Sequence, residues 1–342
     1  MVDGRGGGRP GRLSHARALG PSNRCDSSAP VSRGTFSLIH FWRFRLLAAV
    51  LAVFAPSAAH AQLYEAVGIR AQGMAGAFVA VADDATTTWW NPAGLATGPI
   101  FNGIIEQNTQ GASADRNLGV SFALPSLGVS FYRLRISETA ASGSTDSLSG
   151  DRQDQGTTGT RLPTHVLSQL GVTVGQSLGE HLVLGSTLKL VLADQARGDL
   201  DLGAMARFGA ARVAVVLKNA AAADLTAEGR RVANSRQVRV GGAYVPESAG
   251  AVDVVIAFDA DLTRTATAVG DERRVAGGVE VGLAPRVRVR GGVGVNTARD
   301  ARHSFSGGAS ASLPKGLYLD GQITRGDDEA IKGWGFALRV MF

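Results

Sequence analysis

The chain has 342 residues, of which 44% are hydrophobic and 19% are charged, and its formal net charge is +6. The positive excess lies in residues 1–61, which hold eight arginines and two aspartates, so the rest of the chain is electrically neutral. This balance gives no basic surface for nucleic acid, and no nucleic-acid partner is expected. The only cysteine, Cys25, lies in the same leader, which excludes disulfides, cysteine–zinc sites and thiol catalysis from residues 62–342.

An export signal occupies the end of this leader. Positive charge at 41–45 precedes an apolar run at 46–55, and the sequence Ala-His-Ala that ends at Ala61 has the small-x-small form that signal peptidase accepts. The apolar run is too short to cross a bilayer as a helix. We therefore predict a leader over 1–61 with cleavage after Ala61. Residues 1–35 fit no signal pattern, and they are either the result of a start codon assigned too far upstream or a genuine long leader.

The segment Gly68–Ala96 follows the export signal and reads GIRAQGMAGAFVAVADDATTTWWNPAGLA. Its spacing is not that of a phosphate loop, a zinc site or a nucleophile elbow. It resembles the N-terminal segment of the outer-membrane transport family typified by the long-chain fatty-acid transporter (FadL/TodX), and it is also similar to the related PorV/PorQ group. Asn91, Pro92 and Ala93 are the residues that match the family's hatch motif. The resemblance implies a barrel whose lumen is filled by a hatch, which gates passage beside an opening in the wall.

The chemistry of this segment suits a hatch over residues 62–99. Pro92 lacks an N–H and disfavours helix at Asn91, whose side chain can cap or close a turn. Glycines allow close backbone contact with a barrel wall. A passive plug is the alternative to a gate. The predicted hatch and gating residues are Asn91, Pro92, Ala93, Gly94, Gly73 and Gly76.

No catalytic, metal or cofactor site is predicted. Asp83 and Asp84 have no third carboxylate nearby in the sequence, so a turn or a helix N-terminus is a better interpretation than a cation site. His165, His181 and His303 have no zinc-site spacing and no Gly-x-Ser-x-Gly partner. We therefore expect a protein that is not an enzyme.

Residues 100–342 read as an all-β transmembrane antiparallel barrel of about 14 strands, with 12 as an alternative count. No apolar run of 18 residues follows the leader, so no transmembrane helix is predicted. The candidate strands alternate in polarity, and most are long enough to cross a bilayer when tilted. They lie near 100–110, 117–124, 127–136, 163–176, 181–194, 198–208, 211–219, 236–245, 250–263, 272–283, 286–296, 302–313, 315–325 and 331–342.

The predicted connections alternate between short and long. Every second one is a short turn, while the other set holds the long connections Ser137–Arg161, Ala220–Ser235 and Arg264–Gly270. This asymmetry is typical of an outer-membrane barrel, with short turns in the periplasm and longer loops outside the cell. An even number of strands places both ends of the barrel in the periplasm. We therefore predict a bacterial outer-membrane protein in contact with lipid, and we expect a monomer.

The two faces of the strands differ in chemistry. In 286–296, for example, valines alternate with arginines, so one face can meet lipid and the other can line the lumen. Lumenal charges in a closed barrel need opposite charges nearby. They either hold the wall together or provide a polar path for a solute. The predicted lumenal charges are Asp253, Asp259, Asp261, Glu280, Arg288 and Arg290.

The last strand, 331–342, carries apolar side chains at alternate positions and ends in an aromatic residue. This pattern resembles the signal read by the barrel-assembly machinery, which is the predicted assembly partner. An ordinary half-buried strand is the alternative. The residues concerned are Trp334, Phe336, Leu338, Val340 and Phe342.

The sequence is compatible with three functions. The first is a channel that passes small hydrophobic compounds, fatty-acid-like or aromatic, by diffusion past the hatch. The second is a PorV-type barrel that binds exported proteins, and the third is a structural barrel without transport. A fatty-acid ligand is implied only by the resemblance, because the long connections at 137–161 and 220–235 are polar and offer no apolar capture site.

Overall fold

The computed structural model describes residues 66–111, 115–137, 164–222, 224–227, 230–233, 235–246, 253–267, 270–298, 301–327 and 331–342. Every described residue belongs to one compact unit of the chain, Val53–Phe342. The predicted signal peptide, its cleavage site and most of the connection 137–161 lie outside the described residues.

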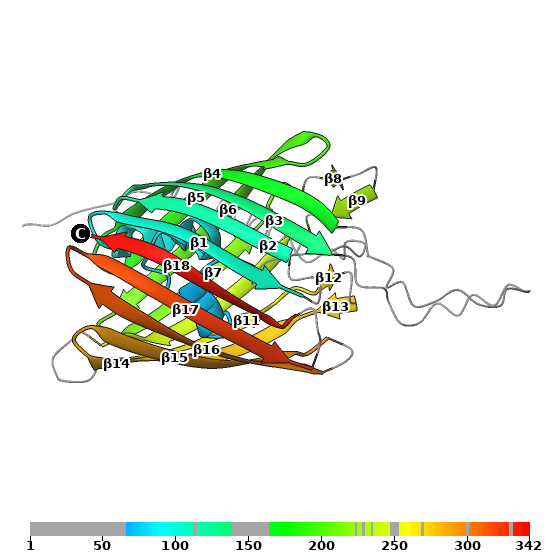
Figure 1. The fold of residues 1–342 in the computed structure, drawn as a ribbon. Coiled ribbons are helices and arrows are strands. Elements are labelled where there is room, and N and C mark those ends of the chain that lie inside the picture. Colours follow the sequence, from blue (N-terminus) through cyan, green and yellow to red (C-terminus); the bar gives the residue numbers. More distant parts are fainter. Residues whose placement is uncertain are drawn as a thin grey trace, which may run out of the picture. The chain divides into compact units, whose positions relative to one another are not determined.

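Fourteen antiparallel strands close into a barrel in which the first strand pairs with the last (Figure 1). This confirms the predicted fold class and the larger of the two strand counts. The barrel strands in chain order are β1 (Asn102–Gln110), β2 (Asp115–Ala123), β3 (Leu127–Ser137), β4 (Thr164–Leu178), β5 (Leu182–Leu192), β6 (Ala196–Phe208), β7 (Ala211–Lys218), β10 (Gln237–Tyr244), β11 (Asp253–Asp261), β14 (Arg274–Ala284), β15 (Val287–Asn296), β16 (Arg302–Leu313), β17 (Leu317–Gly326) and β18 (Gly333–Met341).

Two of the predicted long connections are not simple loops. The connection 220–235 contains the hairpin of β8 (Asp224–Ala227) and β9 (Arg230–Ala233). The connection 264–270 leads into a second hairpin, formed by β12 (Thr265–Thr267) and β13 (Gly270–Glu272). The prediction of plain loops is wrong here, because strands of three or four residues are too short to show a period-two pattern.

The two ends of the barrel are built differently. At one end, called here the short-turn end, few residues join β2 to β3, β4 to β5, β6 to β7, β14 to β15 and β16 to β17. Gly179, Gly209 and Gly316 lie in three of these turns with positive φ, which glycine adopts at little cost. The C-terminal residue Phe342 lies at the same end and exchanges backbone hydrogen bonds with Phe101. The opposite end, called the long-loop end, carries both small hairpins (Figure 1).

Apolar side chains cover the outside of the barrel. In β5 the leucines point outward and Leu188 is 64% exposed, while Thr187 on the opposite face is fully buried. β15 repeats the pattern, with Val293 exposed and Arg290 buried. This alternation is the one predicted from the sequence. An apolar outer face suits hydrocarbon, which cannot solvate a charge.

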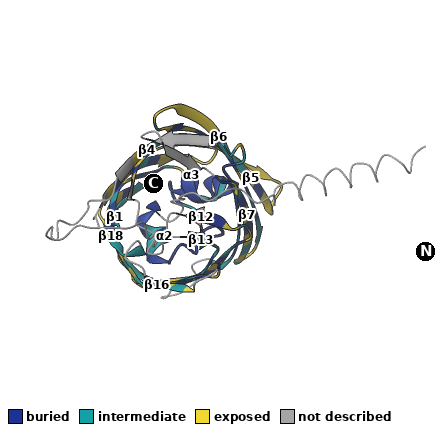
Figure 2. Cartoon of the chain, turned by 90° about the vertical axis from the view of Figure 1, so that its right-hand side faces the viewer, coloured by how far each residue is buried: buried dark blue, intermediate teal, exposed yellow. Residues whose placement is uncertain are grey.

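Residues 66–98, called here the inner segment, lie inside the barrel (Figure 2). The segment forms three short helices, α2 (Ile69–Gly73), α3 (Thr87–Trp90) and the 3-10 helix η2 (Pro92–Thr97). No helix among the described residues is long and apolar enough to cross a membrane. The segment is rich in alanine and glycine, and the small volume of these side chains lets the three helices fit within the lumen.

Glycines in the wall make room for the inner segment. A Cβ added at Gly278 of β14 would lie 2.7 Å from the carbonyl oxygen of Met74, and one added at Gly128 of β3 would lie 2.8 Å from Thr88 Cγ2. Added Cβ atoms at Gly185, Gly203 and Gly292 would overlap the inner segment more severely. At these five positions the wall has no side chain, and the inner segment occupies the space that one would need.

Among the three predicted hatch glycines, Gly73 packs against a side chain of the wall. A Cβ at Gly73 would lie 2.7 Å from Arg290 Cδ of β15. Gly94 instead packs inside the segment against Ala82 and Thr87, and Gly76 lies in a turn with φ of 79°. The hatch role of the three glycines stays a prediction.

The fit between wall and inner segment predicts the effect of one added methyl group. Gly292→Ala places a Cβ against the backbone of Met74 and Ala75, and overpacking of this kind costs about 1–3 kcal/mol. We expect limited proteolysis of the purified barrel to cut the inner segment faster in this variant. Gly321→Ala is the matched control, because no atom lies within 4 Å of the added Cβ. Equal cleavage rates in both variants would contradict a close fit.

Candidate functional site

Two buried wall carboxylates hold the backbone of the inner segment. Glu106 of β1 accepts hydrogen bonds from the N–H groups of Gly68 (2.8 Å) and Ile69 (3.1 Å). Asp259 of β11 accepts from the N–H groups of Phe78 (2.8 Å) and Val79 (2.9 Å). An ionised carboxylate accepts only, so each of these side chains suits a pair of amides at a chain turn.

Cationic and amide side chains of the wall bind carbonyl oxygens of the segment. Asn108 Nδ2 donates to the carbonyl of Ala66 at 2.7 Å. Lys218 Nζ donates to the carbonyl of Trp89 at 2.9 Å, and Arg274 Nη2 donates to that of Ala75 at 3.2 Å. Acidic side chains of the wall thus accept from N–H groups of the segment, and basic side chains donate to its carbonyls. These bonds satisfy backbone groups of the segment that do not pair with a strand of the barrel.

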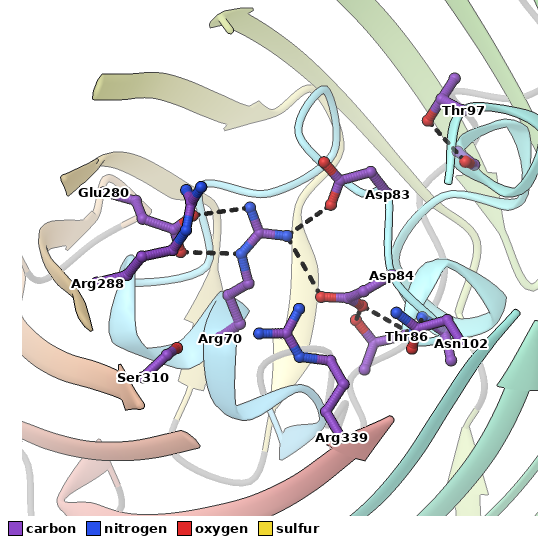
Figure 3. Close-up of polar contacts among 12 residues, drawn as sticks. Arg70, Asp83, Asp84, Thr86, Thr97, Asn102, Glu280, Arg288, Ser310 and Arg339 are labelled. Atoms are coloured by element: carbon purple, nitrogen blue, oxygen red, sulfur yellow. Dashed lines mark hydrogen bonds and ion pairs between the residues drawn. The ribbon is translucent and has the colours of Figure 1, made fainter. Parts of the chain in front are cut away.

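Arg70 of α2 joins the inner segment to the wall (Figure 3). Its Nε and Nη2 lie 2.9 and 3.0 Å from the two carboxylate oxygens of Glu280 on β14, a bidentate pair. Its Nη1 lies 2.5 Å from Asp83 Oδ1 and 3.5 Å from Asp84 Oδ2. Burial lowers the pKa of Arg70, but Asp83 and Glu280 outweigh this effect and hold it well above its usual value. The guanidinium therefore stays charged.

The acidic pair Asp83-Asp84 lies in a turn, but a third carboxylate is near it. Asp84 Oδ1 accepts from the N–H of Thr86 at 2.9 Å, just before α3 begins. Glu280 reaches the same guanidinium from a distant part of the chain. The expectation that no further carboxylate lies nearby is wrong in space, because it considered only sequence neighbours.

Four of the six predicted lumenal charges meet in one network. Glu280 lies 3.4 Å from both Arg288 and Arg290 of β15, and Arg288 lies 2.6 Å from Asp253. The network continues through Asp320 of β17, which lies 3.2 Å from Arg290.

Arg339 of β18 extends the network, with its Nε 3.1 Å from Asp320. Neither Asp320 nor Arg339 was among the predicted lumenal charges. Alternation in the last two strands contains the signal for both, since Arg339 stands between the outward residues Leu338 and Val340, and Asp320 follows the outward residue Leu319. Arg70 has no comparable signal, because it lies outside any strand.

Asp259 and Asp261 have other partners. Asp261 binds Arg239 of β10 at 2.6 Å and accepts from the N–H of Arg274 at 2.9 Å. Asp259 accepts hydrogen bonds from two backbone N–H groups of the inner segment. The six predicted charges are therefore divided among different contacts, because they lie at different heights along the three barrel strands β11, β14 and β15. No group of three or more His, Cys, Asp or Glu among the described residues could hold a metal ion.

Asn91 organises the middle of the inner segment. Its Oδ1 accepts from the N–H of Ala93 at 3.1 Å, which caps η2, and Pro92 stands first in that helix. Its Nδ2 donates to the carbonyl of Val79 at 2.9 Å, so the side chain ties two turns together. Ala93 packs in a buried cluster with Met205 of the wall.

Apolar side chains of the wall surround much of the inner segment. One cluster joins Phe78 and Trp90 to the wall residues Tyr132 and Val255. Further apolar side chains point inward from β3, β5, β6 and β7, and each is buried: Leu134, Val183, Met205 and Val216. A barrel with a water-filled lumen has polar side chains at such positions. The lumen here therefore presents an apolar surface to the inner segment.

The aromatic residues of the last strand face outward. Trp334 and Phe336 are exposed and stack with centroids 6.1 Å apart, while Phe342 is 66% exposed at the short-turn end. Leu338 is exposed and Val340 half-buried on the same face of β18. Their role as an assembly signal stays a prediction.

Comparisons with known proteins show the fold but no family. No family model and no curated protein matches the chain. Among solved structures, CymD, a monoaromatic hydrocarbon channel, is similar over 81% of this chain and 97% of its own, with 12% identity and a TM-score of 0.55. Omp33 of Acinetobacter baumannii is similar over 71% and 98%, with 6% identity and a TM-score of 0.45. The likeness to CymD shows a shared barrel fold, and the FadL/TodX resemblance stays a prediction.

Removal of the Arg70 side chain should loosen the inner segment. Arg70→Met leaves Glu280 and Asp83 without their shared cation, and breaking a buried ion pair costs about 3 kcal/mol. We expect amide exchange in residues 69–90 to become about 100-fold faster, with little change in the barrel strands. Arg286→Met, at an exposed turn, is the control. Unchanged exchange would show that Arg70 does not fasten the segment.

Proposed function

We propose that the chain is an outer-membrane barrel that passes small hydrophobic compounds, fatty-acid-like or aromatic, when the inner segment moves aside. The observation that carries this proposal is the apolar lining around the segment, formed by Tyr132, Val183, Met205, Val216 and Val255. Apolar side chains in a lumen lower the free energy of an apolar solute there, and they disfavour hydrated ions and sugars.

An outer-membrane location is part of the proposal. It is supported by the apolar outer face of the barrel, by the predicted signal peptide over 1–61 and by the outward aromatic side chains of the last strand. Under this proposal the short-turn end faces the periplasm and the long-loop end faces outward.

The kind of cargo is supported by one neighbour of the fold. CymD, which shares the barrel fold at 12% identity, is a monoaromatic hydrocarbon channel. That identity carries no cargo over by itself. A hydrocarbon cargo agrees, however, with the apolar lining of this barrel, which is observed independently of the comparison.

Gating follows from how the segment is held. In the described conformation the segment occupies the middle of the lumen, so a solute can pass only if part of the segment moves. Polar contacts from Glu106, Asp259 and Glu280 join it to the wall, together with apolar packing that an apolar solute can replace. Under the proposal, apolar contacts between the solute and the wall replace the contacts that the wall loses when the segment shifts.

A structural barrel without transport is the competing function. The overlap expected for any Cβ at Gly185, Gly203 or Gly292 favours it, since such a fit leaves the segment little room. The two functions differ in one measurable property, which is solute flux.

Flux should be measured in vesicles whose outer leaflet is lipopolysaccharide, because plain phospholipid is itself permeable to apolar solutes. We expect the protein to speed the entry of a radiolabelled alkylbenzene at least several-fold over empty vesicles, with no effect on glucose. Replacing two lining residues, Met205→Gln and Val216→Thr, should reduce alkylbenzene entry because it adds polar atoms to the path. Entry equal to that of empty vesicles would support the structural barrel.

A further inference from the structure

Three arginines face outward at the long-loop end of β2 and β3. Arg116 of β2 and Arg133 and Arg135 of β3 are exposed, while the adjacent residues Asn117 and Leu134 are buried and face the lumen. The alternation therefore places all three guanidinium groups on the outer surface of the barrel.

The strand register brings the three arginines together. Leu118 pairs with Arg133, so continuing the register by two residues brings Arg116 next to Arg135. The N–H of Arg135 donates to Asn117 Oδ1 at 2.8 Å, which keeps the two strand ends in contact. Opposite residues in an antiparallel pair have Cβ atoms roughly 5 Å apart, and like charges at that distance destabilise the pair.

No described side chain neutralises this cluster. No ion pair joins these three arginines to any residue in the described part of the chain, and their cross-strand partners on β1 and β4 are the uncharged residues Thr109, Ser168 and Val166. An anion from outside the described barrel would remove the repulsion.

The three arginines lie at the border of the apolar outer face that is nearer the long-loop end. Thr109 of β1 pairs with both Arg116 and Trp334, so the exposed Trp334 stands in the same cross-strand row. One step toward the short-turn end, the outward residues are Leu118 and Phe131, which are apolar and exposed. Tryptophan collects at membrane interfaces, and lipid phosphates lie at the same depth.

We propose that Arg116, Arg133 and Arg135 bind the phosphate groups of lipopolysaccharide in the outer leaflet. Arginine forms bidentate hydrogen bonds with phosphate oxygens, and three adjacent guanidiniums match the charge of a phosphorylated lipid A. The apolar side chains of Leu118 and Phe131 lie where its acyl chains begin. The site rests on the proposed outward orientation of the long-loop end, and not on transport.

The test compares lipid binding by the folded barrel in detergent and by two triple variants. The site variant is Arg116→Gln, Arg133→Gln and Arg135→Gln together. The control variant, Arg197→Gln with Arg264→Gln and Arg286→Gln, removes the same charge from other exposed positions. The affinity for purified lipid A and for its dephosphorylated form is measured by native mass spectrometry, and heat-modified gel migration verifies that each variant is folded.

We expect the site variant to bind lipid A about 100-fold more weakly than the wild type, and the control variant to match the wild type. The wild type should prefer lipid A over the dephosphorylated lipid, with a preference that weakens in high salt. Equal affinity of wild type and site variant, or of the two lipids for the wild type, would overturn the proposal. Displacement by millimolar inorganic phosphate would also overturn it, since the site would then take a free anion. Alkylbenzene flux is a separate readout, so its absence leaves this result unaffected.

Discussion

A chain enclosed in a barrel must find side-chain partners for the backbone groups that its own helices and turns leave unpaired, because the closed ladder leaves no strand edge for it to join. In this protein Glu106 and Asp259 each accept two backbone N–H groups of the inner segment, while Lys218 and Arg274 donate to its carbonyls. Inward glycines let the backbone come close enough for these bonds to form. The inward face of the wall is thus shaped for one particular segment.

Much of the barrel could be predicted from the sequence, because period-two alternation is local and repeats along each strand. The polarity of 181–194 and 286–296 predicts both the strands and the face each side chain takes. The small hairpins at 224–233 and 265–272 could not be predicted, since they are shorter than the pattern needs. The site is harder to predict for another reason. Arg70 meets Glu280 only after the barrel closes, and nothing near Arg70 in the sequence indicates that partner. Asn91 is an intermediate case, because its capping role follows from the adjacent Pro92 while its bond to Val79 does not.

Charged and apolar contacts have separate tasks in this lumen. Arg70, Glu280, Arg288 and Asp253 form a network toward the short-turn end of β11, β14 and β15, and the pairs Lys189–Asp201 and Arg239–Asp261 lie toward the long-loop end. These pairs hold charges away from bulk water, which is favourable only when both partners are present. The apolar clusters fill the remaining contact with the inner segment and have no directional bonds. Under the proposed function, the segment shifts where its contacts are apolar while its charged contacts keep it in register.

The central claim is that solute passes only when the inner segment moves, and a reversible cross-link tests it most directly. Because residues 62–342 contain no cysteine, Thr88→Cys with Gly128→Cys introduces one defined pair, at a site where a Cβ on residue 128 lies 2.8 Å from Thr88 Cγ2. This proximity suits a disulfide, whose Cβ atoms are roughly 3.5–4.5 Å apart. Alkylbenzene entry into vesicles with a lipopolysaccharide outer leaflet is measured before and after reduction, with each single cysteine variant as control. The account predicts that the oxidised double variant loses entry and that reduction restores it. Equal entry in the oxidised and reduced forms would contradict it.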